Sequence, residues 1–408
     1  MASSPPFHPN ARAWLIAAAL VGTGQQTFVV LRNQYLLDLG LSAPTIASVQ
    51  GVGGAAGIAA GLLGLWGLRR FTARVALAAG VAANALGFAI QAIATQPAWL
   101  LAGAAAAGLG IQGLTMIAAP FLTRQSSASE RVRLFATHTI AIQALPGAAG
   151  ALIAGQLQRV AGHALGSPLL GYRVALAIGC AAVLVALLPL ARIREARPRR
   201  VRSSFVDVFR LRHPRRAALL LTPDVIIFFG SGLTIPFLQL YFKERFTLGP
   251  AGIGGLYAVM MLAGGVGHLL SPRLARRYGT WPVIIGSQLA SLPFFGELLL
   301  AHAVPFAATA FVLRQAVMNV SSPLVGSFLH SNVVDEDSGP LASYRMLAQS
   351  VAWAGANFLA GPLMALDKGG FRFVIAVTMA SYVVGVASGV LVYPRLSLAG
   401  REASAPAR

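Results

Sequence analysis

The sequence predicts an all-α membrane protein with twelve transmembrane helices arranged as two six-helix pseudo-repeats. Three observations indicate this fold class: the composition, the number of long apolar runs, and a repeat between the two halves of the chain. Of the 408 residues, 56% are hydrophobic and 11% are charged, whereas an average soluble domain has about 45–50% and about 25%. So little polar surface cannot cover a globule in water, and the chain is therefore predicted to lie in a lipid bilayer.

Twelve apolar runs are long enough to cross a hydrocarbon core of about 30 Å, which takes about 20 helical residues. They cover residues 13–32, 43–66, 74–95, 98–122, 134–157, 171–191, 217–242, 251–270, 281–301, 304–329, 341–366 and 371–393. The segment before the first run lacks the pattern of a cleaved signal peptide. We therefore expect it to lead from the cytoplasm into the first span.

The basic residues predict the orientation. With twelve spans both termini share a side, and that side carries 24 basic residues against 7 on the other, with Arg314 left inside a span. By the positive-inside rule both termini are predicted to be cytoplasmic, in the plasma membrane, here a bacterial inner membrane. The basic segment 192–216 is predicted to be a cytoplasmic linker against anionic lipid head groups. Nucleic-acid binding is not expected, since the densest run of charges, Arg192 to Arg202, has no folded scaffold and no aromatic residues between its arginines.

The linker divides the chain into two predicted six-helix bundles, residues 1–191 and residues 217–408. A single offset of 207 residues aligns polar positions of the two bundles: Arg69-Arg70 with Arg276-Arg277, Glu130 with Asp337, and Gln112 with Asn319. Two parallel six-span repeats are the plan of one class of secondary transporter, in which the substrate site lies near the membrane midplane.

With these features the chain resembles the major facilitator superfamily over almost its whole length. The family's loop signature after the second span takes the form Gly61-Leu-Leu-Gly-Leu-Trp-Gly-Leu-Arg69-Arg70, with Leu65 where an aspartate is usual. Its second copy reads Pro272-Arg-Leu-Ala-Arg276-Arg277-Tyr-Gly279. The resemblance implies a permease that works by alternating access, and a cytoplasmic gating role for Arg69, Arg70, Arg276 and Arg277.

The sequence motifs that are typical of enzymes do not indicate that this chain is an enzyme. The segment Gly108-Leu-Gly110-Ile-Gln-Gly113 spells a dinucleotide fingerprint, but that motif needs a preceding strand and a following helix. Here it lies inside an apolar run, where small residues allow close helix packing. Metal-ligand and nucleophile motifs are missing from the sequence. We therefore expect no cofactor, no metal and no enzymatic activity.

Polar residues inside the spans are the candidate substrate-binding residues, because burial in a bilayer is costly for them. Arg314 lies about 15 Å into the tenth span at helical rise and shares a polar face with Gln315 and Asn319. It either binds an anionic group of the substrate or ties helices together. Further candidates for substrate contact or interhelical hydrogen bonding are Gln25 and Gln26 in the first span and Gln112 in the fourth.

Two acids lie within spans and are candidates for proton coupling. Asp224 is a proton carrier or the ion-pair partner of Arg345, and the ion pair is the favoured interpretation. Glu297 lies in the outer part of the ninth span and is the weaker candidate. The spans of the first half contain no acid, which weakens support for an exporter of cationic drugs.

Together these features predict a monomeric secondary active transporter, surrounded by membrane lipids, that moves a small polar or anionic organic solute. Protons are the candidate coupling ion. An efflux antiporter of drugs or metabolites is the alternative with the same fold. A non-transporting membrane sensor or scaffold is the alternative from another class.

Overall fold

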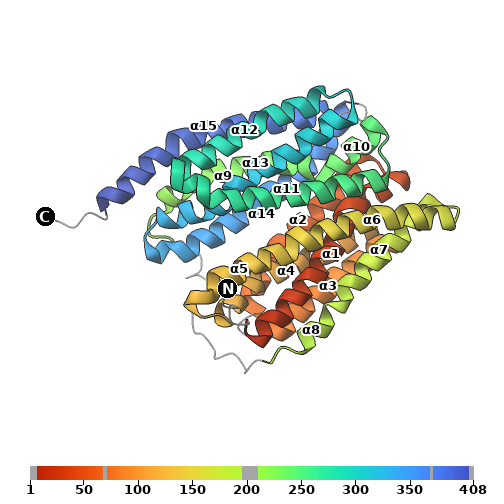
Figure 1. Cartoon of the computed structure of the whole chain (residues 1–408), viewed down its shortest axis with the longest axis horizontal. Helices are drawn as coiled ribbons and strands as arrows, with labels where there is room; N and C mark the ends of the chain where they lie inside the picture. Colours follow the sequence, from red (N-terminus) through yellow and green to blue (C-terminus); the bar gives the residue numbers. More distant parts are fainter. Residues whose placement is uncertain (1–6, 68–70, 195–209, 368–370, 404–408) are drawn as a thin grey trace, which may run out of the picture. The chain divides into compact units, whose positions relative to one another are not determined.

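The computed structural model describes residues 7–67, 71–194, 210–367 and 371–403 (Figure 1). These residues form long helices, and no strand occurs among them. In the first half the helices are α1 (Pro9–Asp38), α2 (Ala43–Gly67), α3 (Ala73–Ile93), α4 (Pro97–Arg124), α5 (Ala128–Thr139), α6 (Leu145–Ala164), α7 (Pro168–Val185) and α8 (Leu187–Ala191). In the second half they are α9 (Pro214–Thr234), α10 (Leu238–Phe246), α11 (Pro250–Tyr278), α12 (Thr280–Leu300), α13 (Val304–Ser331), α14 (Asp335–Leu366) and α15 (Arg372–Ala403).

The predicted all-α membrane fold is confirmed. Within the described residues, nine helical segments are long and apolar enough to cross a membrane by length and composition. The long helices α2, α13 and α14 lie where the second, tenth and eleventh spans were predicted. Large apolar side chains such as Ile93, Leu269 and Leu366 are about 70% exposed (72%, 70% and 68%), as expected of surfaces that face lipid.

Local sequence signals explain where several helices begin and end. Proline occupies the first turn of α1, α4, α7 and α9, a position at which its missing N–H costs nothing. Thr72 and Ser167 cap α3 and α7, each accepting a backbone N–H at 3.4 Å. Between α11 and α12 the chain turns at Gly279, whose φ of +89° favours glycine.

Two predicted spans are interrupted where the sequence places a proline. The fifth span changes to a π-helical turn at Ile140–Ala144, just before Pro146. The seventh span changes to a 3₁₀ turn at Ile235–Phe237, which contains Pro236. Proline lacks the N–H that continues the helical ladder and clashes with the preceding turn, so the backbone takes another helical form at both points.

Spatial clustering divides the chain into two compact units. The first unit comprises Met1–Arg202 and Thr247–Met261, and the second comprises Ser203–Phe246 and Leu262–Arg408. Helix α11 therefore contributes its first turns to the first unit and its remainder to the second. Residues 195–209, the centre of the predicted linker, lie outside the described residues.

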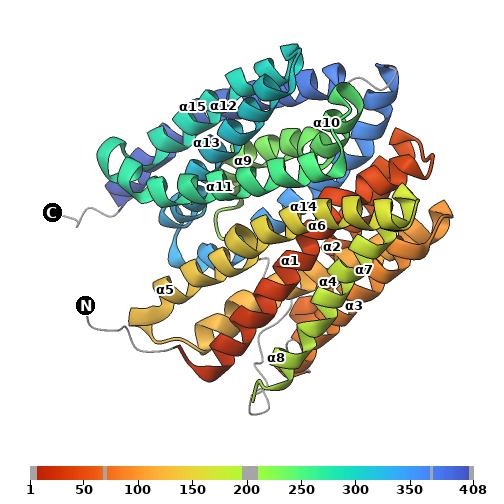
Figure 2. The ribbon, with the colours of Figure 1, turned by 45° about the vertical axis from the view of Figure 1, so that its right-hand side comes forward.

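Helix packing repeats between the units. In the first unit, α1 packs against α6 and α7, and α3 packs against α4 and α7 (Figure 2). In the second, α9 packs against α14 and α15, and α12 packs against α13 and α15. The first helix of each unit thus contacts the fifth and sixth spans, while the third contacts the fourth and sixth. This agreement supports the internal repeat that the 207-residue offset predicts.

Hydrogen bonds at the start of the first helix repeat between the units as well. At the start of α1, the Asn10 amide donates to the side chain of Gln125 at 3.1 Å and to the carbonyl of Arg194 at 2.9 Å. At the start of α9, the Arg216 guanidinium donates to the carbonyls of Asn332 and Leu396 at 2.8 and 3.1 Å. In both units the first helix is therefore joined to the ends of the fourth and sixth spans.

Candidate functional site

Arg314 lies in the interior of the second unit. Its side chain is 3% exposed, and its Nη2 donates to the hydroxyl of Tyr382 on α15 at 2.7 Å. That hydroxyl lies 2.6 Å from the Oγ of Ser231 on α9. The guanidinium also lies 4.7 Å from the ring centre of Phe295 on α12, a distance that allows a cation–π interaction.

The charge of Arg314 is compensated only by neutral groups among the residues that the structure describes. Its Nη1 donates to the side-chain oxygen of the adjacent Gln315 at 3.3 Å, and its buried Nε has no hydrogen-bond partner there. A buried cation without a counter-ion is costly. Arg314 therefore has both the charge and a free donor with which to bind an anion.

Asn319 and Gln112 occupy equivalent places in the two units. Asn319 packs against Gly264 of α11, where a β-carbon would collide with the Asn319 amide. Gln112 packs against Gly57 of α2, where a β-carbon would lie 2.5 Å from the Gln112 Cγ. Gly57 and Gly264, like Gln112 and Asn319, are 207 residues apart. The structure thus places both amides on a glycine of the second helix of their half.

Replacing Gly264 by alanine and replacing the adjacent Gly265 by alanine should have opposite effects on the stability of the protein. We expect Gly264→Ala to destabilise the protein by at most about 1 kcal/mol, because the added methyl group displaces the end of the Asn319 side chain while alanine favours the helix. Gly265 has open space at the same point, so Gly265→Ala should stabilise the helix by up to about 1 kcal/mol. Thermal unfolding of the purified variants measures both. If Asn319→Ala fails to relieve the defect of Gly264→Ala, the proposed collision is wrong.

Gln25 and Gln26 lie midway along α1 in the first unit. The side-chain oxygens of both are buried and without a hydrogen-bond partner among the described residues. The Gln26 amide nitrogen lies 3.6 Å from the Sδ of Met261, a weak acceptor. An unsatisfied buried oxygen costs about 1–3 kcal/mol, so these two acceptors can bind N–H or O–H groups of a polar solute.

Asp224 forms the predicted ion pair with Arg345, which is thereby confirmed. The Arg345 Nε donates to the Asp224 Oδ2 at 2.8 Å, and the carboxylate is 4% exposed. Gln349, one turn after Arg345 on α14, donates to the same oxygen at 2.7 Å. The Asp224 side chain is thus buried and shared between α9 and α14, while its role as a proton carrier stays a prediction.

The remaining sequence candidates lie apart from these clusters. Glu297 is partly exposed on α12, two residues after Phe295. Arg276 and Arg277 are exposed in the last turn of α11, where Arg277 lies over the ring of Tyr278 at 5.2 Å. Arg69 and Arg70 lie outside the described residues. Within the described residues, no group of three His, Cys, Asp or Glu side chains could hold a metal ion.

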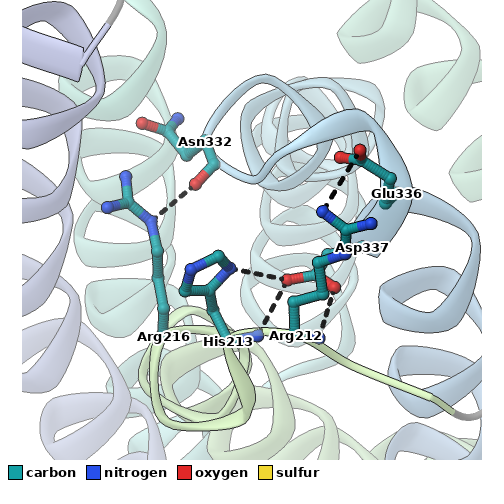
Figure 3. A network of polar contacts seen from close by, with 6 residues as sticks. All are labelled: Arg212, His213, Arg216, Asn332, Glu336 and Asp337. Atoms are coloured by element: carbon teal, nitrogen blue, oxygen red, sulfur yellow. Dashed lines mark hydrogen bonds and ion pairs between the residues drawn. The ribbon is translucent and has the colours of Figure 1, made fainter.

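A polar network where the chain enters α9 has no counterpart in the sequence predictions (Figure 3). The Asp337 side chain, at the start of α14, is 2% exposed. It accepts the backbone N–H groups of Arg212 and His213 at 2.7 and 3.0 Å and lies 3.2 Å from the His213 Nδ1. Asp337 therefore caps the start of α9 and fixes the point at which the linker joins the second unit.

The acidity of Asp337 follows from this geometry. The hydrogen bond from the Arg212 backbone N–H, helped by those from His213 and by the nearby imidazole, lowers the pKa of the carboxyl below its usual value. A carboxyl whose pKa is lowered in the folded state stabilises the protein above its unfolded-state pKa. That contribution is lost as the pH falls through the lowered value.

Asp337→Asn should therefore lower the melting temperature by about 2–4 °C at neutral pH, and the difference from the natural protein should shrink in acid. The neighbouring Glu336 provides a matched control. It forms an exposed ion pair with Arg212 at 3.4 Å, and such pairs contribute little, so Glu336→Gln should leave the melting temperature unchanged. Equal effects of the two variants at all pH values would contradict the capping role of Asp337.

Comparisons with known proteins agree with this architecture. The family model of the Major Facilitator Superfamily matches residues 14–357. A bacterial homologue of the human lysosomal transporter Spinster, solved in an inward-facing and unoccupied conformation, is similar with a TM-score of 0.73 and 16% identity, covering 96% of each chain. A search of the curated proteins gave no match.

Two further solved structures have the same fold. A D-xylose–proton symporter has a TM-score of 0.71 and 16% identity, covering 94% of this chain and 96% of its own. A peptide transporter in complex with sulfate has a TM-score of 0.74 and 16% identity, covering 95% of each chain. At such low identity these likenesses establish the fold alone.

Proposed function

The chain belongs to the major facilitator superfamily, and from this premise we propose that it is a secondary active transporter of a small polar or anionic organic solute. Transport proceeds by alternating access, in which the substrate site opens to one side of the membrane and then to the other. The protein works as a monomer in the bacterial inner membrane, with both termini in the cytoplasm.

The buried guanidinium of Arg314 carries the proposal of an anionic substrate. It is 3% exposed, and the described residues around it supply a phenol hydroxyl, an aromatic ring and an amide. A carboxylate or phosphate would provide the missing counter-charge in a bidentate geometry, which arginine favours. Gln315, whose side-chain oxygen accepts from the Arg314 Nη1 at 3.3 Å, is the candidate contact beside it, and Asn319, which lies against Gly264 of α11, is a separate candidate.

The first unit contributes hydrogen-bond acceptors to the same proposal. The side-chain oxygens of Gln25 and Gln26 are buried and unsatisfied among the described residues. Hydroxyl or amide groups of a solute would satisfy them. Gln112, on the fourth span, is the third candidate contact in this unit. A substrate with both an anionic group and hydrogen-bond donors matches these residue types.

Proton coupling through Asp224 is the second part of the proposal. Its carboxylate lies between a cation, Arg345, and an amide, Gln349. A proton that binds to the carboxylate weakens both contacts and so loosens α9 from α14. Glu297 is the weaker coupling candidate, because it lies on α12 outside this cluster.

Reconstitution of the purified protein in liposomes tests the proposed function. Uptake is measured for D-xylose, dipeptides and a set of carboxylates and phosphate esters, each with and without an imposed pH gradient. Gradient-dependent accumulation of an anionic member is the expected result. Transport of neutral members alone would remove the anionic substrate class. The absence of transport and of binding for every member would favour a non-transporting sensor.

A further inference from the structure

Arg32 lies inside the first transmembrane helix. The sequence places the end of the first span at this residue, but α1 continues to Asp38. Arg32 is therefore six residues, about 9 Å at helical rise, from the end of the helix. Its side chain is partly exposed, whereas Asn33 on the same helix and Gln91 on α3 are fully buried.

The guanidinium of Arg32 is held by amides. Its Nη1 donates to the side-chain oxygen of Gln91 at 3.4 Å and its Nε to that of Asn33 at the same distance. Good hydrogen bonds of this kind measure about 2.7–3.2 Å, so both contacts are loose. Gln91 is itself anchored, because its nitrogen donates to the carbonyl of Gly87 at 3.1 Å. The side-chain oxygens of Gln91 and Asn33 thus bind the Arg32 guanidinium, but only through these two long hydrogen bonds.

The described part of the first unit offers this cation no carboxylate. Its acids there are Asp38 and Glu130. Asp38 is exposed and lies about 120° around the helix from Arg32. Glu130 belongs to α5, beyond the other end of α1. Arginine in a membrane helix normally pairs with an acid or with carbonyl groups, or extends to the interface, whereas the hydrogen-bond partners of Arg32 among the described residues are two amide oxygens, so its positive charge is left for a ligand.

The repeat shows that the fold itself does not require a cation at this place. The residue 207 positions after Arg32 is Gln239, which is 2% exposed and donates to the carbonyl of Pro236 at 2.8 Å. A neutral side chain, that of Gln239, thus occupies the equivalent position of the second unit. The charge of Arg32 is particular to the first unit, as expected of a residue that serves a ligand.

We propose that Arg32 is an anion-binding residue of the first unit, which binds a carboxylate or phosphate group of the transported solute. This inference deepens the proposed function and rests on it. The planar guanidinium donates two parallel hydrogen bonds to such a group. An incoming anion replaces the two loose amide contacts, while the buried Gln91 and Asn33 keep the arginine in place.

Binding measurements with the full-length protein test this role. The probes are succinate, citrate and inorganic phosphate, each titrated into detergent-purified protein by isothermal calorimetry, with the neutral diamide succinamide as the uncharged analogue of succinate. At least one anion should bind to the natural protein. Arg32→Gln should raise its Kd by at least about tenfold, the effect of losing a charge-assisted hydrogen bond. Arg32→Lys keeps the charge without the planar fork and should give a smaller increase.

Arg173 provides the matched control. It lies on α7 of the same unit, where its Nε donates to the hydroxyl of Tyr35 at 3.0 Å. Arg173→Gln removes the same charge and should change the Kd less than twofold. If Arg32→Gln does not fold, Arg32→Lys still decides the question. Unchanged anion binding by a folded Arg32 variant overturns the proposal.

The failure of this inference can be distinguished from that of the proposed function. A protein that transports a neutral solute in liposomes but binds none of the anions remains a transporter and excludes the role of Arg32. A protein that binds an anion through Arg32 but moves no solute keeps the site and excludes transport.

Discussion

Replacing Arg314 by glutamine is expected to lower transport of the anionic substrate at least about a hundredfold. That loss corresponds to about 2.7 kcal/mol, within the range for removing one partner of a buried charge pair. Glutamine keeps much of the side chain's length and polarity but removes the positive charge that the anion needs. Initial rates of uptake into liposomes, normalised to the amount of folded protein, give the measurement.

Tyr382→Phe separates ligand binding from helix packing at this place. Arg314 donates to the Tyr382 hydroxyl at 2.7 Å, and loss of that hydroxyl breaks the connection between α13 and α15 while the cation remains. If Arg314 binds the substrate, Tyr382→Phe should keep at least about a third of the activity. If Arg314 serves only to join the helices, the two variants should be equally impaired, and the substrate role is then wrong.

Asp224→Asn should abolish accumulation driven by a pH gradient while exchange of labelled for unlabelled substrate continues. Asparagine retains the shape of the residue and one acceptor oxygen for the Arg345 Nε and the Gln349 amide, but it loses the charge and cannot bind and release a proton. The internal-to-external substrate ratio should therefore fall to about 1, the value that facilitated diffusion gives. Uptake with and without the gradient is compared with counterflow in the same liposomes.

Gln349→Ala is the control for this variant. It removes the 2.7 Å hydrogen bond to Asp224 but leaves the carboxylate and its partner Arg345, so accumulation should persist. Full accumulation by Asp224→Asn with unchanged pH dependence would show that the ion pair is structural only. Proton coupling would then have to be sought elsewhere, with Glu297 as the remaining candidate.

The sequence predicts the helical architecture well, because each span is a long apolar run, but the helices extend past several of these runs, as α1 does from residue 32 to Asp38. The ion pair between Asp224 and Arg345 was also predictable, since both residues lie near the same predicted side of the membrane in their spans. Gln349 could have been added, because residues four apart share a helix face. Pro146 and Pro236 signalled the interruptions of the fifth and seventh spans, but which helical form replaces the α-helix depends on packing.

Contacts between distant segments could not be predicted. Asp337 binds the two residues that precede α9, Arg212 and His213, which lie more than 120 positions earlier in the chain, and no periodicity connects them. The polar face of the tenth span was also too coarse a prediction. It groups Arg314 with Asn319, whereas the structure directs Arg314 toward α12 and α15 and seats Asn319 on Gly264 of α11. A helical wheel gives the direction of the Cα–Cβ bond, and the end of a long side chain such as that of arginine can point elsewhere.

The amides seated on Gly57 and Gly264 suggest how a duplicated ancestor diverged. A side chain that packs closely against a neighbouring glycine can be replaced by few other side chains. Both copies carry an amide at this position, Gln112 and Asn319. The cations, in contrast, occur in one copy only: Gln239 is the counterpart of Arg32, and Ala107 is the counterpart of Arg314. Packing against a glycine thus goes with an amide in both copies, whereas the intramembrane cations Arg32 and Arg314 have neutral counterparts.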